Sequence, residues 1–189
     1  MLTHMPSGIE KRRFNVDEYY AMADAGILSE RDRVELIEGE IVTMSPIGLA
    51  HAAAVNRANR ALIRAAGDEA IVSPQNPIRL NAFNEPQPDL VLLRPREDFY
   101  RSTHAALTDI LLVIEIADSS LRYDRDVKAS LYARHGIIEY WLVDLAAGTV
   151  ARYTSPEDAT YRTVAVHPRG EGLAPIALPG CTLTVEDLL

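Results

Sequence analysis

The stretch from Ile110 to Ala117 constrains the fold more than any other part of the chain. It reads Ile-Leu-Leu-Val-Ile-Glu-Ile-Ala, and a short apolar run rich in Ile and Val is typical of a strand buried on both faces. Glu115 stands inside this run. Burying an ionised carboxylate without a partner is costly, so we expect Glu115 to be accompanied by a cation, a metal ion or a proton.

A second apolar run, over residues 87–93, carries its acid at the start of the strand. It reads Gln-Pro-Asp-Leu-Val-Leu-Leu, so the acid is Asp89. If the two strands are neighbours, alternation along each strand lets Asp89 and Glu115 converge on one helix-covered face of a sheet. The alternative makes Asp89 a turn residue after Pro88 and pairs Glu115 with a structural arginine.

The rest of the chain predicts one α/β domain of mixed type. Apolar periodicity and turn residues separate a loose tail over residues 1–13 from a single domain over residues 14–189. We expect helices over 16–25, 49–66 and 122–134, a hairpin over 33–44, and strands over 70–73, 78–80, 137–143, 149–154 and 161–166.

The helix predicted after Glu115 presents a lysine on its apolar stripe. The stripe consists of Asp124, Val127, Lys128, Leu131, Tyr132 and His135, which are spaced by three and four residues. Lys128 could therefore extend its flexible side chain toward the carboxylates. The alternative is a snorkelling lysine whose ammonium group reaches water.

Two carboxylates and one lysine suit metal-assisted hydrolysis of a phosphodiester. Hard oxygen ligands hold Mg²⁺, which keeps several waters and completes its shell with substrate phosphate oxygens. The cation lowers the pKa of a bound water, and a nearby ammonium group can position the nucleophile.

Composition limits the other classes of function. Acidic residues outnumber basic ones, 27 to 19, and the net charge of −8 argues against avid nonspecific binding of nucleic acid. Cys181 is the single cysteine, so neither an intrachain disulfide nor a cysteine-based zinc site can form. The polar first residues do not resemble a signal peptide, and no apolar run is long enough for a membrane span, so we expect a cytoplasmic protein.

The order of the motifs resembles the Uma-type restriction endonuclease family of the PD-(D/E)xK nuclease superfamily. The resemblance covers roughly residues 14–155. It rests on Val34-Glu-Leu-Ile-Glu-Gly-Glu-Ile, His51, Gln87-Pro-Asp-Leu-Val, Val113-Ile-Glu-Ile, Asp124-Arg-Asp-Val-Lys128, Leu131-Tyr-Ala133 and Glu139-Tyr-Trp-Leu-Val-Asp144.

This resemblance implies a restriction endonuclease-like core, in which helices flank a central mixed sheet, preceded by a helix and a hairpin. It makes Asp89 and Glu115 the metal-binding acids, with the Ile116 carbonyl as a further ligand. The lysine that usually follows two residues after the second acid is replaced by Ala117, so the resemblance makes Lys128 its substitute.

The resemblance also suggests residues outside the two acidic strands. Glu35 matches an additional upstream acid of the family, and His51 opens the helix that follows the hairpin. Gln87 and Tyr132 are further candidates from the quoted motifs. The chain departs from the family at 117–120, where Ser-Pro-Ser is common, and at Ile138, where a proline is common.

The leading hypothesis is a Mg²⁺- or Mn²⁺-dependent endonuclease acting on DNA. The rival hypotheses are a non-catalytic binding or assembly module that retains the nuclease fold, and a hydrolase of another phosphorylated substrate. Three arginines of the 49–66 helix could contact phosphates or form a solvated face: Arg57, Arg60 and Arg64. We also expect a homodimer, because the apolar strand over 137–143 and the hairpin after it offer sheet surface.

Overall fold

The structure is a computed structural model, and it describes residues 11–29 and 31–189. Its contacts divide the chain into two compact units. The first unit holds the segment that ends at Met44 together with Leu80–Pro86, and the second holds Ser45–Arg79 together with Gln87–Leu189. The tail predicted over 1–13 lies mostly outside the described residues, and the single domain predicted over 14–189 stays a prediction.

In the first unit, helix α1 runs over Val16–Asp24, one residue shorter than predicted. Its first turn is a capping box. The Glu18 N–H donates to Asn15 Oδ1 at 2.8 Å, and the Asn15 N–H donates to the Glu18 carboxylate at 3.0 Å. These two bonds satisfy main-chain donors that a helix otherwise leaves without a partner.

The predicted hairpin of the first unit is confirmed. Strand β1 (Val34–Ile37) pairs antiparallel with β2 (Glu40–Thr43). The two residues of the turn, Glu38 and Gly39, have φ angles of 53° and 74°. Both lie in the left-handed region, which the tight two-residue turn of this kind requires.

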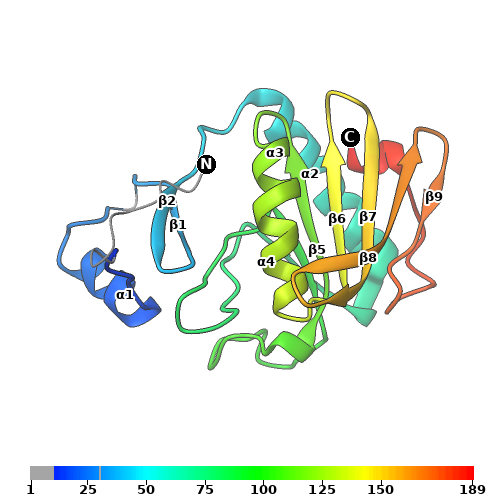
Figure 1. Cartoon of the computed structure of the whole chain (residues 1–189). Coiled ribbons are helices and arrows are strands. Elements are labelled where there is room, and N and C mark those ends of the chain that lie inside the picture. The colour runs from blue at the N-terminus through cyan, green and yellow to red at the C-terminus, as the bar shows by residue number, and fades with distance from the viewer. Residues whose placement is uncertain (1–10, 30) are drawn as a thin grey trace. The chain divides into compact units, whose positions relative to one another are not determined.

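A six-stranded mixed sheet organises the second unit, as predicted (Figure 1). Its order is β3-β4-β5-β6-β7-β8, and neighbouring strands are antiparallel except for β5 and β6, which are parallel. The strands are β3 (Ile71–Pro74), β4 (Leu90–Leu93), β5 (Ile110–Ala117), β6 (Glu139–Asp144), β7 (Thr149–Glu157) and β8 (Thr160–Pro168).

The parallel pair needs a crossover, because the end of β5 and the start of β6 lie at opposite ends of the sheet. One continuous helical segment makes this crossover, and it appears in green in Figure 1. It consists of α3 (Leu121–Tyr123), a π-helical turn (Asp124–Lys128) and α4 (Ala129–Arg134). The segment confirms the helix predicted over 122–134.

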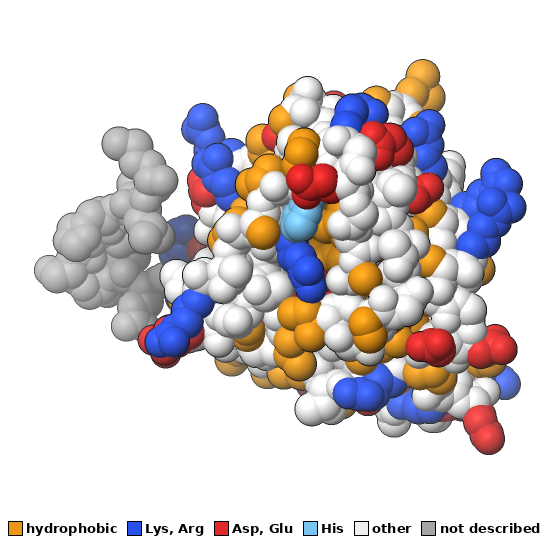
Figure 2. Space-filling model, turned by 90° about the vertical axis from the view of Figure 1, so that its right-hand side faces the viewer, with side chains coloured by type: hydrophobic (Ala, Val, Ile, Leu, Met, Phe, Trp, Pro, Cys, Tyr) orange, Lys and Arg blue, Asp and Glu red, His pale blue; other side chains and the backbone are white. Residues whose placement is uncertain are grey.

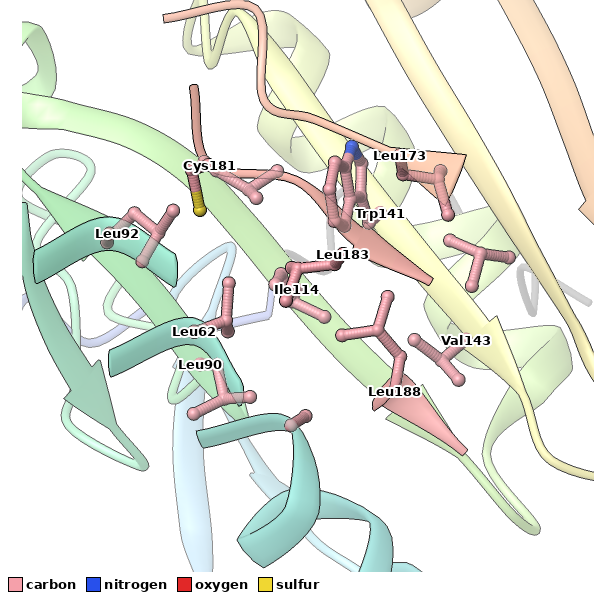
Figure 3. Close-up of a cluster of buried hydrophobic side chains, with 14 of the residues drawn as sticks. Leu62, Leu90, Leu92, Ile114, Trp141, Val143, Leu173, Cys181, Leu183 and Leu188 are labelled. Carbon is pink, nitrogen blue, oxygen red and sulfur yellow. The ribbon is translucent and has the colours of Figure 1, made fainter. Parts of the chain in front are cut away.

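Helix α2 (Leu49–Ala66) coincides with the predicted range and packs on the opposite face of the sheet. Figure 3 shows Leu62 of α2 among apolar side chains of β4, β5 and β6. The C-terminal segment completes this core with β9 (Gly172–Leu173), β10 (Leu183–Thr184) and a short 3₁₀ turn (Val185–Leu188). Further 3₁₀ turns span Gly67–Glu69 and Leu107–Asp109.

Two expectations about strands are corrected. Residues 78–80 form no strand, although Ile78 and Leu80 are buried, because a short apolar run can fill a core without joining a ladder. Strand β6 lies inside the sheet between β5 and β7, so it offers no free edge for a second copy, whereas β8 of the hairpin after it lies at the edge of the sheet. The homodimer stays a prediction.

None of the helices in residues 11–29 and 31–189 combines the length and apolar character needed to cross a membrane.

Candidate active site

The two predicted acids come from neighbouring strands of the second unit. Strands β4 and β5 pair antiparallel, with Leu90 opposite Ile114. Asp89 immediately precedes β4, and its Oδ2 accepts the Ile116 N–H at 2.8 Å. Glu115 is the residue before Ile116, so one main-chain amide links the two acidic positions. Strand β5 continues beyond Leu90, the first residue of β4, and there the Asp89 carboxylate takes the place of a main-chain acceptor for the Ile116 N–H.

His51 and Gln87 contact different parts of this strand end. His51, in the first turn of α2, places Nε2 3.1 Å from Asp89 Oδ2, and both side chains are mostly buried. The Gln87 amide instead donates to the Gln75 carbonyl at 2.6 Å, and the Gln75 N–H donates to the Asp89 carbonyl at 3.0 Å. His51 therefore contacts the Asp89 carboxylate, whereas Gln87 fixes the backbone that leads into β4.

Glu115 is buried with two donors from the crossover helix. Lys128 Nζ lies 2.9 Å from Glu115 Oε1, and the Tyr132 hydroxyl donates to the same oxygen at 2.7 Å. Lys128 is only 5% exposed and Glu115 only 3%. The alternative of a snorkelling lysine is therefore wrong, because the ammonium group is turned toward the carboxylate and away from bulk water.

The helix reaches this geometry through its π-helical turn. In this turn the Ala129 N–H donates to the Asp124 carbonyl, five residues back rather than four. The wider turn rotates Val127 outward to 39% exposure and brings Ala129 into the buried face. The predicted stripe was therefore wrong at Val127, because ordinary α-helical spacing does not anticipate an additional residue in one turn.

The carbonyl at the start of the π-helical turn has a second donor. The Tyr140 hydroxyl, from β6, donates to the Asp124 carbonyl at 3.3 Å. Burial raises the pKa of Tyr140 well above its ordinary value, and the nearby carboxylates of Glu115 and Asp124 raise it further. The hydroxyl therefore keeps its proton and remains a donor.

Sequence reasoning missed a second buried ion pair, at Glu139. Its Oε1 accepts from Arg152 Nε at 2.7 Å and from Trp141 Nε1 at 2.8 Å, and its Oε2 accepts the Ile176 N–H at 2.6 Å. Glu139 is fully buried. An acid two residues before a core tryptophan was the available signal, because a buried indole N–H needs an acceptor.

Glu35 lies in the other compact unit. It belongs to β1 and is 2% exposed, and Glu85, in the same unit, is equally buried. Burial raises the pKa of Tyr19, and the nearby charges of Glu85 and Glu35 raise it further. The catalytic role that the family resemblance gives to Glu35 stays a prediction.

The oxygen donors at Asp89 and Glu115 are of the type that binds Mg²⁺. Within the described ranges, no group of three or more His, Cys, Asp or Glu side chains is arranged to hold a metal ion. Mg²⁺ commonly takes one or two carboxylates from the protein and fills its other positions with water and phosphate oxygens. The buried Lys128 ammonium beside Glu115 also shows that this position accommodates a positive charge. The residues present therefore fit such a cation.

The mixed sheet, its helix-covered faces and the acids at the strand ends have a counterpart among solved structures. A search of solved structures finds "a putative nuclease belonging to DUF820" from Anabaena variabilis, with a TM-score of 0.70 and 19% sequence identity. The match covers 93% of this chain and 97% of that chain. At this identity, the likeness concerns the fold alone.

The family model Uma2, described as "Putative restriction endonuclease", matches residues 16–186. The chain therefore belongs to the Uma2 family, which confirms the resemblance found in its motifs. A search of curated protein sequences finds no match.

Proposed function

We propose that the chain is a Mg²⁺- or Mn²⁺-dependent endonuclease that hydrolyses DNA phosphodiester bonds. One observation carries the proposal. Asp89 accepts the N–H of the residue that follows Glu115, and Glu115 in turn is paired with Lys128 at 2.9 Å. The two acids and the lysine that this chemistry needs therefore come from contiguous elements of one unit. Membership of a family described as restriction endonucleases supports the same reaction class.

Asp89, Glu115 and the Ile116 carbonyl would hold the cation. Once bound, the cation supplies a coordinated water of lowered pKa and polarises a phosphoryl oxygen. Lys128 as an ammonium group has three N–H donors, so it can orient the attacking water and offset the charge that develops on the phosphate. Tyr132 holds Glu115 Oε1 in place through its hydroxyl.

Helix α2 supplies the cations for a negatively charged substrate. The helix contains three exposed arginines and no acidic residue, in a chain whose net charge is −8. Arg57 donates to the Leu189 carbonyl, whereas Arg60 and Arg64 form no ion pair with any acid in the described part of the chain. We infer that the exposed arginine stripe of α2 contacts DNA phosphates.

Figure 2 shows one face of the molecule, on which basic and acidic side chains are interspersed. A phosphate backbone favours a surface where cations are gathered without acids between them. The arginine stripe of α2, a helix without acidic residues, meets this requirement.

Incubation of the protein with plasmid, linear duplex and single-stranded DNA tests the proposed activity. Cleavage should require Mg²⁺ or Mn²⁺ and should disappear in Asp89→Asn. The matched control is Glu139→Gln. Glu139 is a buried acid of β6, and its oxygens accept from Trp141, Arg152 and the Ile176 N–H. Metal-dependent cleavage that survives in Asp89→Asn would overturn the assignment. Metal-independent binding of DNA without cleavage would favour the non-catalytic binding module.

Binding of a labelled duplex at several salt concentrations tests the α2 surface. Loss of two phosphate contacts in the Arg60→Ala, Arg64→Ala variant should weaken binding and lower the slope of log affinity against log salt by about 2. Arg101→Ala is the control for Arg→Ala substitution, because Arg101 is exposed in the loop that precedes β5. An unchanged slope in the double variant would remove α2 from the interface.

A further inference from the structure

The π-helical turn is the one departure from regular helix geometry in the crossover between β5 and β6. It ends at Lys128, the residue that contacts Glu115. Such turns are rare and carry a single widened ring of hydrogen bonds, so something in the surroundings has to favour the wide form.

Tyr140 contributes a specific contact to the turn. The Asp124 carbonyl accepts the Ala129 N–H across the wide turn and also accepts the Tyr140 hydroxyl at 3.3 Å. A carbonyl oxygen has two lone pairs, so both bonds can form together. Tyr140 comes from β6, where it is opposite Val113 of β5, two residues before Glu115. The tyrosine therefore ties the turn to the strand pair that holds the acid.

The position of the turn determines which side chains face the sheet. Asp124 and Lys128, the first and last residues of the turn, are both nearly fully buried, while Val127 between them points outward. A change in the turn would rotate Lys128 relative to Glu115, because Lys128 is the last residue of the turn and reaches Glu115 through its side chain.

We propose that Tyr140 is a positioning residue that fixes the π-helical turn and, through it, the ammonium group of Lys128 against Glu115. Its effect on turnover rests on the proposed nuclease function, but its effect on the helix does not. Tyr140 itself does not contact the reacting atoms. Its ring packs between those of Tyr132 and Tyr153, with centroid distances of 5.2 and 5.3 Å.

The chain offers a closely matched control. Tyr161 is stacked on Tyr140, and its hydroxyl also donates to a main-chain carbonyl, that of Ile137, at 2.9 Å. Tyr140→Phe and Tyr161→Phe remove the same atom from the same aromatic cluster. Only the first substitution removes a bond to the π-helical turn.

Hydrogen exchange of the peptides that cover residues 121–134 provides a readout that needs neither metal nor DNA. Exchange of the Ala129 amide and its neighbours should accelerate in Tyr140→Phe and should stay at the wild-type rate in Tyr161→Phe, while strands β4 and β5 remain protected in both. Equal exchange in the two variants would overturn the proposal.

A double-mutant cycle then tests whether Tyr140 acts through Lys128. Tyr140→Phe should lower turnover about tenfold with KM unchanged, the size expected from the loss of one hydrogen bond. In a Lys128→Met background the same substitution should cost nothing more, because interacting residues are not additive. Additive losses would refute an action through Lys128. If wild-type protein does not cleave DNA but the exchange difference appears, the proposed function fails while the fixing of the turn stands.

Discussion

Glu115 and Glu139 are buried glutamates of adjacent strands that have different partners on opposite faces of the sheet. Glu139 shares one face of β6 with the core residues Trp141 and Val143, whereas Glu115 is paired in register with Leu142 and faces the crossover helix. Both oxygens of Glu139 accept hydrogen bonds, including one from the rigid fork of Arg152.

Lys128 and Tyr132, in contrast, both donate to Oε1 of Glu115, and the cation of this pair is a lysine ammonium group. A guanidinium group holds a carboxylate in a fixed geometry, while an ammonium group on a flexible side chain can exchange one partner for another. We therefore propose that Glu139 joins parts of the fold, whereas Glu115 is the carboxylate that can accept a metal ion.

The largest expected effect is on stability at Glu139. Glu139→Ala leaves the Arg152 guanidinium, the Trp141 indole N–H and the Ile176 N–H without their acceptor. Removing one partner of a buried pair costs about 3–5 kcal/mol, so the free energy of unfolding should fall by that amount in a urea titration. If the free energy of unfolding falls no more than in a variant at an exposed site, such as Glu157→Ala, the hydrogen bonds of Glu139 do not stabilise the fold.

Lys128→Met should affect turnover more than any other single change on the Glu115 side. Methionine keeps most of the buried side-chain volume and removes the charge, so turnover should fall by about 10²-fold. Without its ammonium partner, Glu115 should gain more from a cation, and Mn²⁺ should raise the melting temperature more in this variant than in wild type. Equal cleavage rates in wild type and Lys128→Met would exclude the lysine from the reaction.

Removal of the Tyr132 hydroxyl tests the neutral donor to Glu115. Tyr132→Phe keeps the buried ring and deletes one hydrogen bond to Oε1. Because that bond goes to a charged group, the free energy of unfolding should fall by about 1.5–3 kcal/mol. Thermal unfolding with and without Mn²⁺ checks this, since the metal should recover part of the loss. If Mn²⁺ stabilises wild type and this variant equally, the tyrosine does not act on a metal-binding carboxylate.

The smallest expected effect belongs to Arg152→Lys. The charge opposite Glu139 is kept, but the rigid fork is lost, so we expect a decrease of about 1 kcal/mol in the free energy of unfolding. DNA cleavage should be unchanged, because this pair is on the other face of β6. A cleavage defect larger than the stability loss explains would remove the distinction between the two glutamates.

Sequence reasoning predicted the acidic strands and most elements because their signals are local. The apolar run around Glu115, the Ala-rich stretch that became α2, and the Glu38-Gly39 turn each indicate their structure within a few residues. The helix predicted between β5 and β6 is the kind of connection that a parallel pair of strands requires.

The missed features depend on contacts between elements or on exceptions to regular spacing. The bond from Tyr140 to Asp124 joins residues 16 positions apart, and the Arg152–Glu139 pair joins residues 13 positions apart on neighbouring strands. Val127 was misplaced because a helical wheel assumes a constant rotation per residue, which the π-helical turn breaks. The sequence over the π-helical turn contains no sign of the widened ring, and the acid two residues before Trp141 indicates an acceptor for the indole but does not identify Arg152 as its cation.

The crossover also has a consequence for how the protein reaches its folded state. The contact between Lys128 and Glu115 spans 13 residues, whereas that between Asp89 and Ile116 spans 27 and that between His51 and Asp89 spans 38. Shorter loops close at a lower entropic cost and therefore close sooner. During refolding, we expect the lysine–glutamate pair to form within the strand–helix–strand unit before β4 and α2 dock. The ammonium group would then neutralise Glu115 as the strand becomes buried, ahead of the arrival of the second acid.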